Sequence, residues 1–459
     1  MTLPTGFAVR IRGDVRRLEG SRVLVGGSPL RAVRLSAVAT DLLDGDDLVV
    51  RDSSSATLAR RLLDGNLADP VPGPTLVPDA LTVVIPVRDR AEQLDRCLAA
   101  LTGLVCIVVD DASVDPSAVR EVTERHGARL VVLATNVGPA GARNAGLRHV
   151  TTPHVAFVDS DVTVSPGTLL ALGHHFADPQ VALIGPLVRG RSRSGRPRWF
   201  ERYDVAASSL ALGRRSCSVR PGAAVGWLPS ACLVGRVEAL GNGFAAEMQV
   251  GEDVDLVWRL VEAGHVVRYD PGQVAHHDVR TTVRGWLGRK VVYGSGGADL
   301  GRRHGDAVAP AILSPAMGLA AAAVLLRGRW SLPIAGVAAF LGARSVRAAL
   351  PPVRGRAAVA SRLSITGLGW AVRQESALLL RHWWPMTALL CMVSRQARRA
   401  LATAVVVDAA VALTVERPRV GPLTGWVGRR LDDLAYGTGL WLGAIRARDA
   451  RCLAIRVTK

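Results

Sequence analysis

The stretch "LTVVIPVRDRAEQLDRCLAALTGLVCIVVDDAS", residues 81–113, decides the fold class of this chain. It begins with a short apolar run, continues as an amphipathic segment that ends at a glycine, and returns to a second apolar run. Continuous apolar runs of this length are typical of strands buried on both faces, and the middle segment has a helical period. A strand, a helix and a second strand at this spacing predict a parallel βαβ unit.

The same alternation continues as far as residue 161. A helix is predicted at 115–127, a strand at 128–135, a helix at 140–150 and a strand in "HVAFVDSD" at 154–161. We therefore predict an α/β fold with an open, mostly parallel sheet. Ligands of such sheets bind beyond the carboxyl ends of the strands, so a binding site is expected at that edge.

Acidic pairs end two of these strands, Asp110 with Asp111 and Asp159 with Asp161. Alternate residues of a strand face the same side, so Asp159 and Asp161 would point together into the crevice. Two like charges in one place are costly unless a cation or hydrogen-bond donors compensate them. A divalent ion that bridges to a diphosphate would do so, whereas an ordinary strand-end turn would explain either pair alone.

A glycine-rich segment, "NVGPAGARNAG" at 136–146, leads into the helix after the third strand. Its small residues let a ligand approach the backbone, and a helix N-terminus favours a phosphate or another polar oxygen. Arg143 and Asn144 add donors. An ordinary helix cap is the alternative for this segment alone, but polar groups at three successive strand ends favour a ligand site.

Further along the chain, Glu252 and Asp253 begin a predicted helix with an apolar face. Adjacent acids at a helix start often only complement the helix dipole, but they could also supply a general base and an orienting carboxylate. The segment "VVRYDPGQVAHHDVR" then predicts a strand and a loop with His276 and His277. Either histidine could complete a metal site or be structural.

The chain has 459 residues and a formal net charge of +18, and its composition is globular. Residues 311–459 hold 21 arginines and lysines against 6 acids, together with six of the ten tryptophans. This composition favours contact with an anionic membrane surface, with a basic helical domain that has a solvated face as the alternative. No base-reading motif occurs, so we expect no nucleic-acid partner.

The six cysteines are scattered without a C-x-x-C pair, which predicts reduced thiols in a cytoplasmic protein and no structural zinc. The first residues lack the apolar core of a signal peptide. Residues 307–326 carry no charge and are long enough to span a bilayer. Two prolines and Gly318 weaken that candidate.

Residues 1–75 are expected to form a winged-helix-like module, and such modules bind peptides or nucleic acids or mediate protein contact. "VLVGGSPLRAVRLS" at 23–36 predicts two short strands around a Gly-Gly turn, and two segments that start with serine and stop at glycine predict short helices. The segment 1–75 resembles small winged-helix proteins that recognise peptides, which implies peptide recognition here. The stretch "DPVPGPTLVP" at 69–78 is rich in proline and typical of a linker, and we place the linker between the domains at 76–80. The α/β domain then covers 81–305, and an apolar, basic helical region covers 306–459.

The segments "VVIPVRDR", "VVDDAS", "NVGPAGARNAG", "FVDSD", "GNGFAAEMQVGEDVDLVWRL" and "YDPGQVAHH" occur in the order and spacing of family 2 inverting glycosyltransferases of the GT-A fold. The chain resembles this family over residues 80–295, and the motifs are specific as a set. The resemblance implies that 81–305 is a catalytic domain that transfers a sugar from a nucleotide donor by one inverting displacement. It also implies a divalent metal, Mg or Mn, that offsets charge on the leaving diphosphate.

The resemblance assigns roles to the candidate residues. Asp253 would be the catalytic base that deprotonates the acceptor hydroxyl, with support from Glu252. Asp161 would bind the metal, with His277 as the possible second ligand. The nucleotide and sugar would be held by Pro86, Arg88, Asp110, Asp111, Gly141, Arg143, Asn144 and Asp159, of which Pro86, Arg88 and Asp111 would line the uridine pocket.

One motif of the processive family members does not occur at the expected place. Cellulose and chitin synthases carry Q-x-x-R-W after the base, whereas this chain reads "RTTVRGWLGRKVVYGSGG" at 280–297. Processive extrusion of a polymer is therefore not expected. Contacts to the acceptor or the diphosphate in this segment could come from Trp286, Arg289, Lys290 and Tyr293.

The layout of the whole chain is similar to the glycosyltransferases of the mycofactocin cofactor system. The similarity rests on "VLVGGSPLRAVRLS", "ARRLLDGNLADP", "RRHGDAVAP" and "RRLDDLAYGTGLW". It implies a peptide-derived redox cofactor or its precursor as the acceptor, UDP-glucose as the donor and a β-linked product.

Two other functions remain open at this point. A polyprenyl lipid or a cell-envelope glycan could be the acceptor, which the basic C-terminal third favours. A non-enzymatic adaptor that binds peptides or nucleic acids would suit the N-terminal module and the positive charge, but Asp111, Asp161 and Asp253 together argue against it. For the enzyme we expect a cytoplasmic location at the inner face of the cell membrane.

Overall fold

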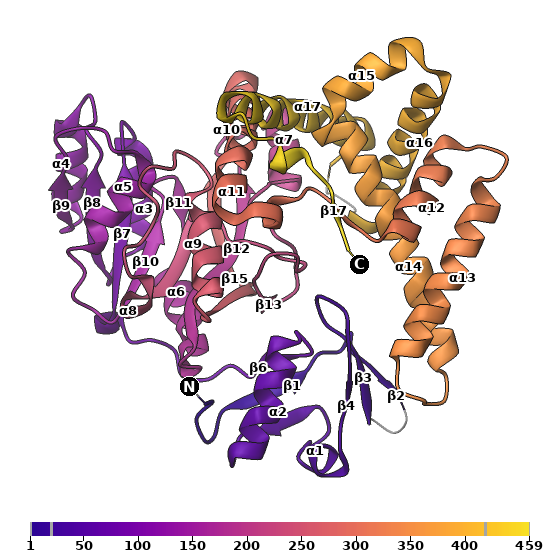
Figure 1. Cartoon of the computed structure of the whole chain (residues 1–459). Helices are drawn as coiled ribbons and strands as arrows, with labels where there is room; N and C mark the ends of the chain where they lie inside the picture. Colours follow the sequence, from indigo (N-terminus) through magenta and orange to yellow (C-terminus); the bar gives the residue numbers. More distant parts are fainter. Residues whose placement is uncertain (1, 19–21, 417–419, 459) are drawn as a thin grey trace. The chain divides into compact units, whose positions relative to one another are not determined.

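A computed structural model describes residues 2–18, 22–416 and 420–458 of the chain. Its residues divide into two compact units, which are drawn in Figure 1 and described separately below. The first unit comprises Met1–Arg16, Leu24–Gly195 and Ser208–Val279, and the second comprises Arg17–Val23, Arg196–Ala207 and Arg280–Lys459.

One large sheet forms the centre of the first unit. Within the described residues it has nine strands, in the order β11-β15-β12-β14-β10-β7-β8-β9, with β13 paired to β15. The strands are β7 Leu81–Val87, β8 Val105–Asp110, β9 Arg129–Val132, β10 His154–Val158, β11 Val162–Thr163, β12 Val181–Arg191, β13 Cys217–Ser218, β14 Cys232–Arg236 and β15 Val266–Asp278.

The predicted strand–helix alternation is present in this sheet. β10, β7, β8 and β9 are parallel neighbours, and Val84 of β7 lies opposite both Phe157 and Ile107. The connecting helices bury their apolar faces, for example Leu94 and Leu98 on the first of them. These helices are α3 Ala91–Ala100, α4 Pro116–Arg125 and α5 Gly138–Leu147.

The complete sheet is mixed, so the expectation of a mostly parallel sheet is only partly right. β14 runs antiparallel to β10 and β12, and β11 and β13 run antiparallel to β15. A buried strand has the same apolar composition whichever way its neighbour runs, so its sequence does not report the direction. Further helices of this unit are η1 Pro78–Ala80, α6 Pro166–Leu172, η2 Gly173–Ala177, α8 Val237–Leu240 and α9 Glu252–Glu262, besides two in the N-terminal residues.

The N-terminal residues form small sheets and two helices around a core of their own. β1 lies between β5 and β6, and the predicted hairpin is present as β3 and β4. Asp52 caps α2 by accepting from the backbone N–H of Ser55. The winged-helix assignment and the domain boundaries stay predictions. The elements are β1 Ala8–Ile11, β2 Arg16–Leu18, β3 Val23–Gly26, β4 Arg31–Arg34, α1 Ala37–Asp41, β5 Asp47–Val49, α2 Ser53–Asp64 and β6 Ala68–Pro70.

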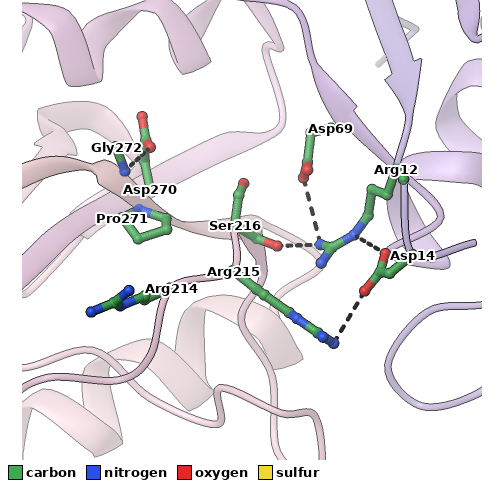
Figure 2. A pocket seen from close by; sticks show the side chains of 10 residues that line it. Arg12, Asp14, Asp69, Arg214, Arg215, Ser216, Asp270, Pro271 and Gly272 are labelled. Atoms are coloured by element: carbon green, nitrogen blue, oxygen red, sulfur yellow. Dashed lines mark hydrogen bonds and ion pairs between the residues drawn. The ribbon is translucent and has the colours of Figure 1, made fainter.

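Polar side chains join these N-terminal elements to the large sheet within the first unit. Arg60 donates to both carboxylate oxygens of Asp178 at 2.8 and 2.6 Å. Arg12 donates to the carbonyl of Ser216 and lies 3.8 Å from a carboxylate oxygen of Asp69 (Figure 2). A cavity of about 400 Å³ lies here, lined by Arg12, Gly13, Asp14, Asp69, Arg214, Arg215, Ser216, Asp270, Pro271 and Gly272.

The second unit is mainly helical. α10 and α17 pack closely at Gly439 of α17. A Cβ on this residue would lie only 1.9 Å from the carbonyl oxygen of Val291 on α10, so the contact leaves no room for a side chain. The helices are α7 Trp199–Ala206, α10 Val283–Ser295, α11 Gly297–His304, η3 Gly305–Val308, α12 Pro315–Leu326, α13 Ser331–Ala349, α14 Arg356–Ala377, η4 Leu378–His382, α15 Trp384–Val393, α16 Arg395–Val411, η5 Ala412–Glu416, α17 Pro422–Ala447 and η6 Arg451–Leu453, and two short strands, β16 Ile312–Leu313 and β17 Arg456–Val457, pair in parallel.

The uncharged run 307–326 is not one helix. It contains the end of η3, then β16, and finally α12, which has 12 residues and is too short to cross a bilayer. Pro315 stands at the start of α12, where its missing N–H costs nothing, and it prevents the helix from extending backwards. Among the described helices, α13 with 19 residues is long and apolar enough to cross a membrane by length and composition alone.

Candidate active site

The carboxyl ends of β7, β8 and β10 and the start of α9 carry the acidic residues predicted for the site. Val87 at the end of β7 pairs with Asp110 at the end of β8, and β10 ends at Val158, directly before Asp159. α9 begins at Glu252, so the two predicted acids occupy its first turn. The sheet register and one helix start therefore place these groups in the first unit, at the strand ends.

Arg143 links α5 to two of these acids. Its Nη2 donates to Asp159 Oδ1 at 2.6 Å, and its Nη1 donates to Glu252 Oε1 at 3.0 Å. The side chain is buried, and its guanidinium lies over the ring of Phe244 at 5.3 Å. This buried cation between two carboxylates holds the end of β10 against the start of α9. Separation of the two elements would be costly, because it would leave a buried charge without its partner. A nucleotide contact by Arg143 stays a prediction.

Asp253 is held by two backbone N–H groups. Its Oδ2 accepts from Ser230 N at 3.1 Å, and its Oδ1 accepts from Val254 N at 2.8 Å. Burial, followed by the charge of the adjacent Glu252, raises the pKa of Asp253 to about 7 against the effect of these hydrogen bonds. A carboxylate with a pKa near neutrality can be ionised and still accept a proton, as a general base must.

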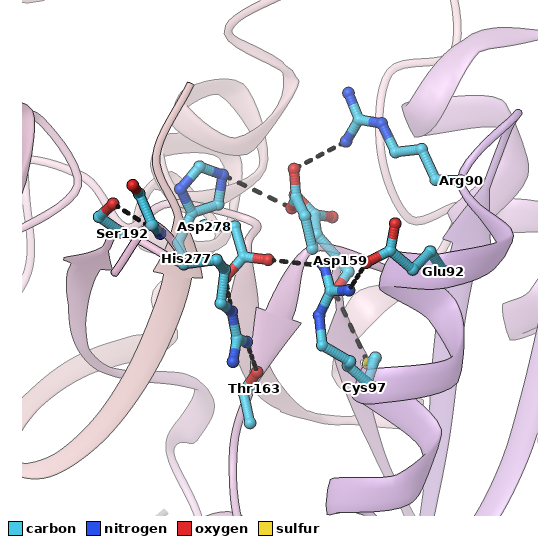
Figure 3. Close-up of polar contacts among 12 residues, drawn as sticks. Arg90, Glu92, Cys97, Asp159, Thr163, Ser192, His277 and Asp278 are labelled. Carbon is cyan, nitrogen blue, oxygen red and sulfur yellow. Dashed lines mark hydrogen bonds and ion pairs between the residues drawn. The ribbon is translucent and has the colours of Figure 1, made fainter. Parts of the chain in front are cut away.

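Asp161 has different neighbours from Asp159, although the two are one residue apart. His277 Nε2 lies 3.5 Å from Asp161 Oδ1, and Arg90 Nη1 donates to Asp161 Oδ2 at 2.7 Å. His277 and Arg90 are labelled in Figure 3, where a dashed line runs from each to a carboxylate. The histidine is placed by β11, whose Val162 pairs with His277 on β15. A carboxylate and an imidazole at this separation fit a divalent ion such as Mg or Mn, if phosphate oxygens complete its ligand set.

Asp110 and Asp111 make distinct local contacts. Asp111 accepts from the backbone N–H groups of Val137 and Gly138 at 2.7 and 2.9 Å, so it holds the start of α5. Asp110 is fully buried and accepts from Ser113, but its Oδ2 has no hydrogen-bond partner among the described residues. Because an unpaired buried oxygen is costly, a donor from a ligand or a water would be favoured there.

The loops that follow β7 and β8 contain strained residues. Asp89 has a φ of 54° and Ala112 a φ of 56°, a left-handed conformation that costs a non-glycine residue about 1–2 kcal/mol. Asp89 Oδ1 accepts from Val114 N at 2.6 Å and so ties the two loops together. Such strain is often found at ligand sites. Pro86 is the last residue but one of β7, and Arg88 is exposed on the loop that follows.

Asn144 and Gly141 lie on α5 and have packing partners. Asn144 donates to the carbonyl of Phe244 at 2.7 Å and accepts from its N–H at 2.9 Å, so the amide anchors the loop before α9. Gly141 packs against the side chain of Val137. Their predicted roles toward the nucleotide and sugar are not tested by these contacts and stay predictions.

The four residues predicted for the acceptor or the diphosphate belong to the second unit. Trp286 is buried in an aromatic cluster with α7, and Lys290 Nζ lies 3.0 Å from Asp432 Oδ1. Arg289 lies over the ring of Tyr293 at 4.8 Å. Each of the four therefore has a partner inside its own unit, and the proposed ligand contacts stay predictions.

Three residues of this site were not predicted from the sequence. Arg90 pairs with Asp161, Ser230 donates to Asp253, and Phe244 contacts both Arg143 and Asn144. Arg90 stands in the polar stretch after β7, which was a usable signal. Ser230 and Phe244 are distant from their partners in the chain, and no local pattern marks them.

A second group of possible metal ligands lies in the first unit. His174, His175 and Asp270 place ligand atoms within 4.8 Å of one another. Burial lowers the pKa of His175 to about 4, and its Nε2 lies 3.3 Å from a carboxylate oxygen of Asp270. A neutral histidine paired with a carboxylate explains this contact without an ion.

Comparison with known proteins shows the family of this chain. A family model described as "Glycosyl transferase family 2" matches residues 82–240. The "Pre-mycofactocin glycosyltransferase" of Mycobacterium tuberculosis is 42% identical over 467 aligned positions, which cover 98% of each chain. An uncharacterized glycosyltransferase of the same organism is 41% identical over 92 residues, which cover 20% of this chain and 41% of that protein.

One solved structure is similar at a lower level. It is a mannosyltransferase from Pyrobaculum calidifontis in complex with GDP-Man and Mn2+, with 21% identity and a TM-score of 0.41, covering 80% of this chain and 91% of that one. The comparison that decides the family is the one with the mycobacterial protein, because its 42% identity extends over nearly the full length of both chains. On this basis the chain belongs to the pre-mycofactocin glycosyltransferases, within glycosyl transferase family 2.

Proposed function

We propose that this protein is an inverting glycosyltransferase that moves glucose from UDP-glucose to mycofactocin or its precursor and forms a β linkage. The observation that carries the proposal is Asp253, a backbone-held carboxylate whose pKa is raised to about 7 beside the strand-end acids. The 42% identity to a pre-mycofactocin glycosyltransferase supports the choice of acceptor.

In this proposal Asp253 takes the proton of the acceptor hydroxyl while that oxygen attacks the anomeric carbon. The bond from the anomeric carbon to the diphosphate oxygen breaks on the opposite side, so the configuration inverts and no covalent enzyme intermediate is needed. Glu252, which Arg143 holds in place, raises the pKa of Asp253 and so favours proton uptake by Asp253. Arg143 also positions Asp159, the proposed contact to the ribose or the donor sugar.

The nucleotide would lie along the ends of β7 and β8. We assign the uridine contacts to Pro86, Arg88 and Asp111, and the remaining nucleotide and sugar contacts to Asp110, Gly141, Arg143 and Asn144. The unpartnered oxygen of Asp110 supports this placement, because a donor from the ligand would satisfy it.

A divalent metal, Mg or Mn, would be held by Asp161 and His277. When bound it would offset negative charge on the leaving diphosphate. We expect chelation to abolish transfer and added Mn2+ to restore it, and Asp161→Ala should lower Mn2+ affinity, measured by the electron paramagnetic resonance of free Mn2+, by about tenfold or more. Full transfer after chelation would argue against any metal requirement.

The base assignment has a direct test in Asp253→Asn. The variant should bind UDP-glucose like the natural protein, measured by calorimetry, and lose transfer by a factor of about 100 or more, because general-base catalysis contributes about 10²–10⁴-fold. Asp79→Asn is the matched control, since Asp79 is exposed and precedes the amino end of β7. Transfer by Asp253→Asn at a rate close to that of the control would refute the assignment.

A polyprenyl lipid or a cell-envelope glycan is the second candidate acceptor. The exposed apolar side chains of the helical unit favour it, because a membrane-bound acceptor would require the enzyme at the same surface. Incubation with radiolabelled UDP-glucose and either the mycofactocin precursor or a polyprenyl phosphate would distinguish the two. Label in the lipid fraction alone would replace our first choice of acceptor.

A further inference from the structure

The helix α13 exposes a continuous apolar strip. Leu332 and Phe340 are 82% and 61% exposed, and Val337, Leu341 and the preceding Trp330 are exposed as well. At about 100° per residue of an α-helix, these side chains fall within one half of the circumference, in the order Leu332, Phe340, Val337, Trp330 and Leu341, so they cover the exposed half of α13. We call these five residues the α13 surface. Soluble proteins rarely leave such a strip uncovered, so it indicates a partner.

The other side of α13 is already occupied. Ala335 and Ala338 are buried there, and Ser364 on α14 donates from its hydroxyl to the carbonyl of Ala339 at 2.7 Å. α13 is therefore held in the second unit by one face and presents the other. The α13 surface is a fixed feature of this helical unit.

Arginines stand at both ends of the α13 surface. Arg329 lies over the ring of Trp330 at 5.8 Å, and Arg344 lies over the ring of Phe340 at 6.0 Å. From 315 to 413 the chain carries twelve arginines and only two acids, Glu375 and Asp408. An apolar strip with a tryptophan and arginines at its edges complements a bilayer with anionic head groups. Two copies of this surface would instead repel each other.

From these observations we infer that the α13 surface docks on an anionic lipid bilayer, with α13 lying in the interface and not crossing it. The 19 residues of α13 are enough to cross a membrane by length and composition alone, but Arg344 and Arg347 lie within the helix and leave an uncharged stretch only from Ser331 to Ala343. Such a stretch is about 20 Å long, which is well short of a hydrocarbon core of about 30 Å. The inference does not depend on the proposed glycosyl transfer.

Vesicle sedimentation with the full chain tests the docking. The protein should bind vesicles that contain phosphatidylglycerol in phosphatidylcholine, bind phosphatidylcholine alone more weakly, and lose affinity as salt screens the arginines. Leu332→Asp and Phe340→Asp should each weaken binding to the anionic vesicles by about tenfold or more, since each removes an apolar anchor and adds a repelled charge. Alkaline carbonate should release the bound protein.

Val38→Asp is the matched control. Val38 is 65% exposed on α1, outside the helical unit, and its change adds the same charge to an exposed apolar position. All three variants should keep the thermal unfolding midpoint and the transfer rate of the natural protein in the absence of vesicles. Vesicle binding needs neither donor nor acceptor, so its result is independent of the proposed reaction.

Three results would overturn the docking proposal. The first is failure to bind either kind of vesicle, and the second is equal loss of binding in Val38→Asp and the α13 variants. The third is an oligomer in solution that Leu332→Asp and Phe340→Asp convert to a monomer, because a second copy would then be the occupant of the α13 surface. Resistance of the bound protein to carbonate would contradict the interfacial position and indicate a spanning helix.

Discussion

At the scale of single residues, Asp253 should set the pH dependence of transfer. As the proposed base, Asp253 must be ionised, and its pKa is raised to about 7, so kcat/KM should fall tenfold per pH unit as the pH drops below about 7. Glu252→Gln should shift this limb to lower pH, because the charge that raises the pKa of Asp253 is removed while the charge of Arg143 remains. Rate profiles of both proteins over pH check this. A rise of kcat/KM with pH that is centred near pH 4, about the pKa of an ordinary aspartate, would contradict the raised pKa of Asp253.

The residue types at the site could be predicted from the sequence, but their partners could not. Asp161 is recognisable because it follows a predicted strand, and Asp253 because it stands at the start of a predicted helix. Each of these patterns lies within one short segment of sequence. The contacts Arg90–Asp161 and Ser230–Asp253 join residues far apart in the chain. Only the folded sheet brings such groups together, so no local pattern reports them. The roles of the nucleotide-binding residues remain proposals at this scale.

At the scale of elements, the packing of α10 on α17 makes Gly439 sensitive to substitution. A Cβ there would lie 1.9 Å from the carbonyl oxygen of Val291, so Gly439→Ala must force the helices apart, and we expect a loss of about 1–3 kcal/mol in the free energy of unfolding. Gly425→Ala on the same helix is the control. Its Cβ would make only an ordinary contact of 3.5 Å, and better helix propensity should stabilise it by up to about 1 kcal/mol. Equal stability of the two variants in urea unfolding would refute the close packing.

The elements with a strong local pattern were predicted best. β7, α3 and β8 follow from apolar runs and a helical period within 33 residues. The antiparallel course of β14 was not predicted, because it depends on where the chain returns to the sheet. The composition of 307–326 makes this run a candidate membrane span, but Pro315 divides it and leaves α12 with 12 residues. Composition over a window does not record such a break.

At the scale of the whole molecule, the two units carry two separable proposals. The first unit holds the acids proposed for glycosyl transfer, and the second holds the α13 surface proposed for a lipid bilayer. Substitutions at Asp253 should affect transfer without affecting vesicle binding, and substitutions at Leu332 should do the reverse.

The stereochemistry of the first sugar transferred tests the central claim most directly. Natural protein, UDP-α-glucose and the mycofactocin precursor should give a product whose anomeric proton shows the large coupling of a β-glucoside in NMR spectra, because one displacement with Asp253 as base inverts the anomeric carbon. An α-linked glucoside would contradict the account, since it requires retention of configuration, whereas the proposed single displacement inverts it.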